Sequence, residues 1–126
     1  MKGDGMQVKE IATSRLLWAT SEESLRDAAV RLAVDGVGAL TVSAGGETVG
    51  IFTEHDLVQA VANGVDLDDT PIARYLTAPA VEVEEDAPAE YAVQQMNSYR
   101  LRYLVVVRHG KPRGMLSSRD LLRSVE

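Results

Sequence analysis

The sequence predicts an α+β protein built from two β-α-β-β-α repeats, related by a pseudo-twofold axis and folded into small sheets packed with helices. The first reason is an internal repeat: a shift of 64 positions aligns residues 8–62 with residues 72–126 without a gap. Nine of the 55 aligned pairs are identical, and seven of these lie within the 22 pairs that begin at Leu40 and Leu104. The second reason is that each copy carries the same order of helix and strand patterns. Because a unit of about 55 residues buries little apolar surface alone, we expect the copies to share one core.

The first helix is predicted from a capping signal at residues 20–23, whose acidic residues suit the first turn of a helix. Apolar residues then follow at the spacing of one helical face, and Gly36 is a typical residue for the helix to end on. The predicted apolar face comprises Leu25, Ala28, Ala29, Leu32 and Ala33.

A hairpin and a second helix complete the first copy. Residues 38–43 are rich in strand formers, residues 44–47 favour a turn, and residues 48–52 predict the returning strand. A helix is expected over residues 54–62, and the Asn-Gly pair that comes next ends it.

The second copy repeats this order. We expect a helix over residues 88–99 and a closing helix over residues 118–125. Between them, strands are expected over residues 102–107 and 113–116, with a turn at residues 108–112. The first of these helices is expected to bury Ala89, Ala92, Val93 and Met96.

The domain boundaries follow from the repeat. Residues 1–62 are expected to form the first repeat with an N-terminal entry segment, and residues 72–126 the second. Residues 63–71 are the predicted linker, since they are acidic, contain turn-forming residues and show no apolar periodicity.

The composition excludes several classes of protein. The chain has 13 basic and 19 acidic residues, so its formal net charge is −6, and it contains no cysteine. Disulfide scaffolds, thiol catalysis and cysteine-ligated metal sites are therefore excluded. No apolar stretch approaches the roughly 20 residues needed to cross a bilayer, and no secretory signal opens the chain. We expect a cytoplasmic protein without a membrane partner, and its acidic character argues against a nucleic-acid partner.

One motif stands where each returning strand meets its helix. It consists of glycine, two apolar residues, threonine or serine, two further residues and aspartate, and it occurs at residues 50–56 and 114–120. Threonine or serine followed three positions later by aspartate at a helix start forms a capping box, which needs no ligand. A purely structural role is therefore one interpretation of both motifs.

The same residues also suit a mononucleotide. Gly50 and its counterpart lack a Cβ, so a ligand can approach the backbone closely. Thr53 and Ser117 stand at helix N-termini, where free amides and the helix dipole favour phosphate. Asp56 and Asp120, one turn later, can accept two hydrogen bonds from a ribose 2′,3′-diol.

The duplicated pattern resembles a tandem pair of cystathionine-β-synthase (CBS) domains, known as a Bateman module. The resemblance covers residues 8–126 and rests on the two motifs, on the hairpin before each, and on Thr13 and Thr77 in the segments that enter the copies. It implies an adenosine-containing ligand (AMP, ADP, ATP or S-adenosylmethionine) in two clefts between the repeats, with no further cofactor. It also implies a homodimer.

Carried over residue by residue, the resemblance implies that Asp56 holds the ribose in one cleft, with Thr53 near the ribose or phosphate. In the other cleft it implies the same roles for Asp120 and Ser117. These four residues are the core of the predicted ligand-binding set.

The two clefts are not expected to be equivalent. The resemblance implies adenine contacts near residues 77–81 for the cleft of the first motif and near residues 13–17 for that of the second. In addition, the first copy has two glycines within residues 36–38, where the second copy has two arginines within residues 100–102.

Basic residues gather near the second motif. Residues 100–123 hold seven basic residues and one acidic residue. One interpretation is an ordinary solvated face. The other is that Arg100, Arg102 or Arg119 neutralises a ligand phosphate. Arg119 lies inside the motif and is our candidate, so if a single cleft binds, we expect it to be that of Asp120.

The sequence offers no constellation for catalysis or for a metal. His55 and His109 are the only histidines, and neither has ligand-spaced partners. We therefore expect a regulatory, non-enzymatic module that signals its ligand through dimer formation or an effector protein, with the helices at 54–62 and 118–125 as the contact surface. The alternative is a structural or protein-interaction scaffold in which both motifs are only helix caps.

Overall fold

The computed structural model describes residues 5–12 and 15–124, and the chain divides into two compact units. Unit 1 comprises Met1–Leu16 and Val81–Glu126, and unit 2 comprises Leu17–Ala80. Each unit therefore combines stretches of both sequence repeats, because the chain crosses from one unit to the other after residue 16 and again after residue 80.

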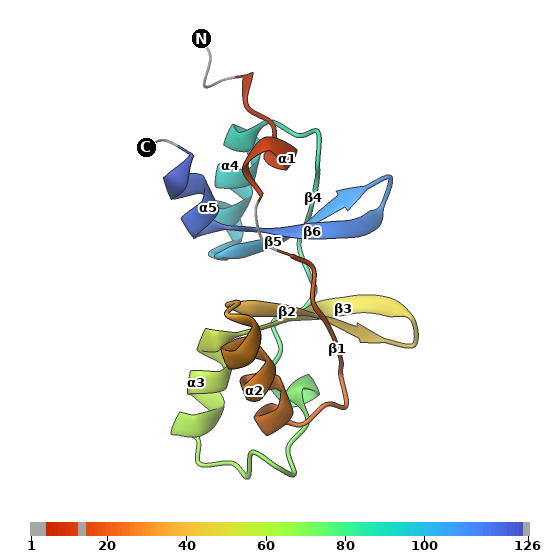
Figure 1. The fold of residues 1–126 in the computed structure, drawn as a ribbon, viewed down its shortest axis with the longest axis vertical. Helices are drawn as coiled ribbons and strands as arrows, with labels where there is room; N and C mark the ends of the chain where they lie inside the picture. Colours follow the sequence, from red (N-terminus) through yellow and green to blue (C-terminus); the bar gives the residue numbers. More distant parts are fainter. Residues whose placement is uncertain (1–4, 13–14, 125–126) are drawn as a thin grey trace. The chain divides into compact units, whose positions relative to one another are not determined.

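Unit 2 is a three-stranded sheet with two α-helices on one of its faces and a short 3-10 helix (Figure 1). Its elements are β1 (Trp18–Thr20), α2 (Leu25–Asp35), β2 (Ala39–Ala44), β3 (Glu47–Thr53), α3 (Glu54–Ala62) and η2 (Ile72–Arg74). β1 pairs in parallel with β2, and β2 pairs antiparallel with β3, so the strand order is β1-β2-β3.

Unit 1 has the same topology, preceded by a short N-terminal helix (Figure 1). Its elements are α1 (Val8–Ile11), β4 (Glu82–Glu84), α4 (Ala89–Tyr99), β5 (Tyr103–Arg108), β6 (Lys111–Ser117) and α5 (Ser118–Arg123). β4 and β5 are parallel, and β5 and β6 antiparallel. The predicted α+β class and the double occurrence of the β-α-β-β-α order are thereby confirmed.

The sequence patterns located the hairpins and the helices after them to within two residues, but the predicted capping signal of the first helix was wrong. Thr20 still belongs to β1, and the turn after it is closed by a hydrogen bond from the Glu23 N–H to the Thr20 carbonyl. The N-cap of α2 is Ser24, whose hydroxyl accepts the N–H of Asp27 at 3.0 Å. The predicted C-terminal stop is confirmed, since Gly36 adopts the left-handed conformation with φ of 64°.

Several further features differ from the sequence-based expectation. The short elements α1 and η2 were not predicted, because four and three residues are too few to show a period. Val93, expected on the buried face of α4, is 41% exposed, whereas Ala92 and Met96 are buried. Ala33, expected on the apolar face of α2, is exposed too.

Each unit has its own apolar core, in which one face of the sheet packs against its helices, so the expectation of one core for the two copies was wrong. In unit 2 the core comprises Ala19, Leu25, Ala28, Leu32, Leu40, Val42, Phe52, Ala60 and Ile72. In unit 1 it comprises Val8, Ile11, Val83, Ala92, Met96, Leu104, Val106 and Leu116.

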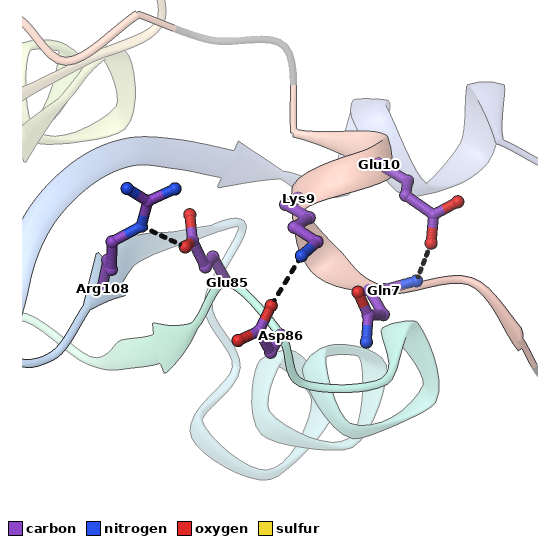
Figure 2. A network of polar contacts seen from close by, with 6 residues as sticks. All are labelled: Gln7, Lys9, Glu10, Glu85, Asp86 and Arg108. Atoms are coloured by element: carbon purple, nitrogen blue, oxygen red, sulfur yellow. Dashed lines mark hydrogen bonds and ion pairs between the residues drawn. The ribbon is translucent and has the colours of Figure 1, made fainter.

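α1 is fastened to unit 1 by apolar and polar contacts together. Val8 and Ile11 lie in the core, and the Val8 N–H donates to the Ala87 carbonyl at 2.9 Å. On the outside, Figure 2 shows the ammonium of Lys9 beside the carboxylate of Asp86, at 2.8 Å. The N-terminal segment is thus an integral part of unit 1, although residues 12–81 separate the end of α1 from the start of β4.

The predicted linker, residues 63–71, packs inside unit 2 against the start of α2. The N–H groups of Leu25 and Arg26 donate to the carbonyls of Thr70 and Leu67, both at 2.9 Å. These are first-turn amides that have no partner within the helix, so the segment completes the N-terminus of α2. None of the helices within the described ranges is long and apolar enough to cross a membrane.

Candidate functional site

The first motif forms a closed capping box between β3 and α3. The N–H of Asp56 donates to the Thr53 hydroxyl at 3.2 Å, and the N–H of Thr53 donates to Asp56 Oδ2 at 2.8 Å. Thr53 has an extended backbone while α3 begins at the next residue, which is the usual geometry of an N-cap. Asp56 is 9% exposed, so its carboxylate is largely removed from water.

Thr77 completes this site from a segment 21 residues later in the sequence. Its hydroxyl lies 3.2 and 3.3 Å from the two carboxylate oxygens of Asp56 and donates to that carboxylate. Thr77 is held in place by an antiparallel bridge to Ile51 of β3, with hydrogen bonds of 2.8 and 2.9 Å in both directions. The sequence pointed to residues 77–81 only as a region, and the direct contact between Thr77 and Asp56 was not predicted.

Gly50 has a role other than the one expected from the sequence. A Cβ at this position would lie 2.7 Å from Leu76 Cδ1 and well inside contact distance of the Thr77 carbonyl oxygen. The space that a side chain would take is therefore filled by the chain's own residues, and the expectation that it admits a ligand was wrong. The glycine allows the segment carrying Thr77 to reach β3, which brings the Thr77 hydroxyl to Asp56.

The second motif forms the same capping box between β6 and α5. The Asp120 N–H donates to the Ser117 hydroxyl at 3.0 Å, and the Ser117 N–H donates to Asp120 Oδ2 at 2.9 Å. In addition, Nη2 of Arg123 lies 2.6 Å from Asp120 Oδ1 and forms an ion pair with it. The Asp120 side chain is 2% exposed and that of Arg123 is 52% exposed. A buried carboxylate is thus neutralised by an arginine that reaches it from the surface.

Arg119, the arginine selected from the sequence as a phosphate contact, is exposed, and the cation that contacts the carboxylate of Asp120 is Arg123. Arg100 and Arg102 are exposed, although the Arg102 carbonyl accepts the Ser118 N–H at 2.8 Å and so adjoins the start of α5. The position of Arg123, three residues after Asp120 on a predicted helix, was the signal that could have found it.

The two sites differ at aligned positions. Gln59 stands in unit 2 where Arg123 stands in unit 1, and His55 stands where Arg119 does. The site of unit 2 therefore combines a carboxylate with neutral donors, whereas that of unit 1 combines a carboxylate with a cation. Thr53 and Ser117 are equivalent, because each is the N-cap residue of the helix in its own site.

The entry segment at residues 13–17 and the two histidines are not among the residues that form the hydrogen bonds of the two capping boxes. Of the entry segment expected at residues 13–17, Thr13 and Ser14 lie outside the described residues. His55 and His109 are exposed. In the described portion of the chain, no group of three or more histidine, aspartate or glutamate side chains is arranged to hold a metal ion.

Comparison with known proteins shows the family. The CBS domain model matches twice, over residues 8–63 and 72–126, so the chain belongs to the CBS domain family. An uncharacterized 17.7 kDa protein from the bps2 3′ region of Acidianus ambivalens is 31% identical over 121 residues, which are 94% of this chain and 73% of that protein. The chain spans 43% of the next relative, from Thermofilum pendens.

Solved CBS pairs share the fold. The CBS domain pair of protein MJ0100, in complex with 5′-methylthioadenosine and S-adenosyl-L-methionine, is 25% identical, with a TM-score of 0.84 and 95% of each chain covered. The CBS domain protein PAE2072 from Pyrobaculum aerophilum, complexed with AMP, is 28% identical, with a TM-score of 0.82 and 92% of this chain and 90% of that chain covered. The resemblance to a tandem CBS pair is thereby confirmed.

Proposed function

We propose that this protein is a regulatory module that binds an adenosine-containing ligand through the carboxylates of Asp56 and Asp120. The observation that carries the proposal is the environment of Asp56. Its carboxylate is buried at a helix start, oriented by the N–H of Thr53, and contacted by the rotatable hydroxyl of Thr77. A purely structural cap needs only the first of these contacts.

The chemistry suits a ribose diol. An ionised carboxylate accepts about four hydrogen bonds through two oxygens, so after the Thr53 N–H is bound there is capacity left for two hydroxyls. Thr77 can turn its hydroxyl to donate to Asp56 or to accept from a ligand, because a hydroxyl both donates and accepts. Ser117 and Asp120 offer the same cap and carboxylate in unit 1, with Arg119 as the candidate phosphate contact.

The solved relatives support the ligand class. The MJ0100 pair was obtained with 5′-methylthioadenosine and S-adenosyl-L-methionine, and PAE2072 with AMP. These compounds share adenosine with its ribose and differ in the group attached to the 5′ carbon. The ribose diol is common to all three, and a carboxylate can recognise a diol. This supports adenosine as the common element for this chain too.

Signalling is proposed to run through association, either in a homodimer or with an effector protein. α3 and α5 begin directly after the two motif hydroxyls, so a ligand at either motif adjoins a helix end. Val58 and Val61 of α3 and Leu122 of α5 are exposed apolar residues. Such residues suit a surface that another molecule covers.

Thermal unfolding with a ligand panel tests the proposal. The purified protein is heated with AMP, ADP, ATP, S-adenosylmethionine or GTP, each at about 1 mM. A site with a micromolar dissociation constant adds about 4 kcal/mol to the free energy of unfolding at a 1,000-fold excess of ligand. A shift with the adenosyl compounds and none with GTP is the expected result. A flat panel contradicts the proposal.

The alternative function is a scaffold without a ligand, and one observation favours it: both capping boxes are complete with protein atoms alone. Asp56→Ala and Asp120→Ala separate the two functions. Loss of a cap costs about 1 kcal/mol of stability, while loss of a ribose contact also weakens binding tenfold or more, which is about 1.4 kcal/mol. Ser24→Ala, which removes the cap of α2 alone, is the matched control and is expected to leave affinity unchanged.

A further inference from the structure

The carboxylate of Asp120 is engaged at both oxygens before any ligand arrives. Oδ2 accepts the N–H of Ser117 at 2.9 Å, and Oδ1 faces Nη2 of Arg123 at 2.6 Å. The side chain of Asp120 is 2% exposed, so the carboxylate has little contact with water. The guanidinium therefore occupies an acceptor position of the carboxylate that a diol hydroxyl would otherwise take.

The carboxylate of Asp56 lies on a helix that contains neither lysine nor arginine. The residue three positions later is Gln59, whose amide lies 3.5 Å from the Asn63 side chain. The contact to Asp56 from outside the motif is the neutral hydroxyl of Thr77, at 3.2 and 3.3 Å. A ribose hydroxyl that takes the place of the Thr77 hydroxyl exchanges one neutral donor for another.

We infer that Arg123 is a specificity-determining residue that lowers the ligand affinity of the Asp120 site by competing with the ribose hydroxyls for the carboxylate. The Asp56 site then fills at lower ligand concentration, and the two sites report two concentration ranges. This inference rests on the proposed function. It also reverses the expectation from the sequence that a single occupied site is that of Asp120.

The physical reason is the difference between the two exchanges. Both contacts are hydrogen bonds to an ionised carboxylate, but Arg123 also carries a positive charge, and burial of the carboxylate strengthens its attraction to that cation. Exchanging the Arg123 contact for a hydroxyl therefore costs more than exchanging the Thr77 contact. Because the Arg123 side chain is 52% exposed, the guanidinium can move away from the carboxylate without being buried, so the ion pair weakens binding without preventing it.

Single-site proteins measure the two affinities separately. Asp56→Asn leaves the Asp120 site as the reporter, and Asp120→Asn leaves the Asp56 site. The probe is 5′-methylthioadenosine, which has the ribose diol and no phosphate, and titration calorimetry gives the dissociation constant. The Asp56 site is expected to bind about tenfold more tightly than the Asp120 site.

Exchanging the aligned residues provides the decisive comparison. In the Asp56→Asn protein, Arg123→Gln is expected to tighten binding about tenfold, because the competing cation is removed. In the Asp120→Asn protein, Gln59→Arg places a cation three residues after Asp56 and is expected to weaken binding by a similar factor. Arg113→Gln in the Asp56→Asn protein is the control: it removes an exposed positive charge from β6 of the same unit and leaves the Asp120 ion pair in place. Thermal unfolding shows which variants are folded.

Three results overturn the inference. The first is equal affinity of the two single-site proteins, and the second is an unchanged or weaker affinity after Arg123→Gln. The third appears when AMP replaces the probe: if Arg123→Gln weakens AMP binding and leaves 5′-methylthioadenosine unaffected, the arginine serves the phosphate and does not compete for the diol. Absence of binding by the unmodified protein contradicts the proposed function itself, which separates that failure from a failure of the inference.

Discussion

The carbonyl oxygen of Thr77 occupies the position that a Cβ on residue 50 would need, so only glycine fits there. A Cβ on residue 50 would also lie 2.7 Å from Leu76 Cδ1, so even alanine cannot be accommodated without movement of this segment. The same segment carries the hydroxyl that contacts Asp56. A backbone position in β3 thereby controls a side-chain contact at the candidate site.

Gly50→Ala is expected to lower the free energy of unfolding by about 1–3 kcal/mol, since overpacking against backbone forces a shift. It is also expected to weaken adenosyl-ligand binding, because Thr77 moves with the displaced segment. Chemical denaturation and calorimetry measure the two effects. Gly5→Ala, at a glycine with nothing within 4 Å of its added Cβ, is the control. An unchanged free energy of unfolding for the Gly50 variant would contradict this prediction, because it would mean that the segment with Leu76 and Thr77 moves aside without cost.

Arg100→Gly is expected to stabilise the protein by about 0.5–1 kcal/mol, because Arg100 ends α4 with a φ of 56°, a conformation that costs a residue with a Cβ more than it costs glycine. The aligned residue, Gly36, ends α2 in the same conformation. Arg102→Gly removes the same charge, but Arg102 does not have a left-handed backbone conformation. This variant is therefore expected not to raise the free energy of unfolding. The denaturant midpoints of the unmodified protein and both variants are compared, and a destabilised Arg100 variant refutes the argument.

Thr41→Val is expected to raise the free energy of unfolding by about 1 kcal/mol. Thr41 is fully buried in β2, and its hydroxyl has no hydrogen-bond partner in the part of the chain that the structure describes. An unsatisfied buried hydroxyl costs free energy that an apolar group of the same shape does not. Val105 occupies the aligned position of the second repeat, and Val105→Thr is the reciprocal variant, expected to destabilise. Denaturant unfolding of both variants checks the pair, and a less stable Thr41→Val protein contradicts the argument.

The docking of α1 is expected to weaken as the pH falls. The hydrogen bond from Lys9, and then the charge of Lys9, hold the pKa of Asp86 below its ordinary value. A carboxyl whose pKa is lowered on folding stabilises the folded state above its ordinary pKa of about 4, and that stability is lost as the pH falls through the lowered value. Figure 2 shows this pair beside Glu85 and Arg108.

The measurement is thermal unfolding between about pH 6 and pH 2 for the unmodified protein and for Asp86→Asn. The stability difference between the two is expected to be greatest at the upper end and to shrink in the acid range. A difference that is independent of pH contradicts the role given to the ion pair. Hydrogen exchange of the Val8 amide, which donates to Ala87, reports the docking of α1 directly.

Much of the fold was predictable because its signals are local and occur twice. The apolar spacing in α2 and α4, the turn residues of both hairpins and the capping residues Thr53 and Ser117 each act within a few positions of the chain. The start of α2 was predicted wrongly because residues 20–23 resemble a capping signal, although Thr20 belongs to β1. The hydrogen bond from the Asp27 N–H to the Ser24 hydroxyl identifies Ser24 as the cap, and those from Leu25 and Arg26 to the segment at residues 63–71 complete this helix start.

The sequence by itself determined the family, the two repeats and the pair of aspartates, since a motif repeated at a fixed offset is visible without coordinates. Tertiary structure alone decided that Thr77 is a partner of Asp56, whereas the contact of Arg123 to Asp120 lies within one helix. Thr77 reaches Asp56 across 21 residues because a bridge to Ile51 places it there, and Arg123 reaches Asp120 because the helix turns it back toward the cap. Hydrogen bonds and ion pairs depend on small differences in distance between atoms, and folding sets those distances.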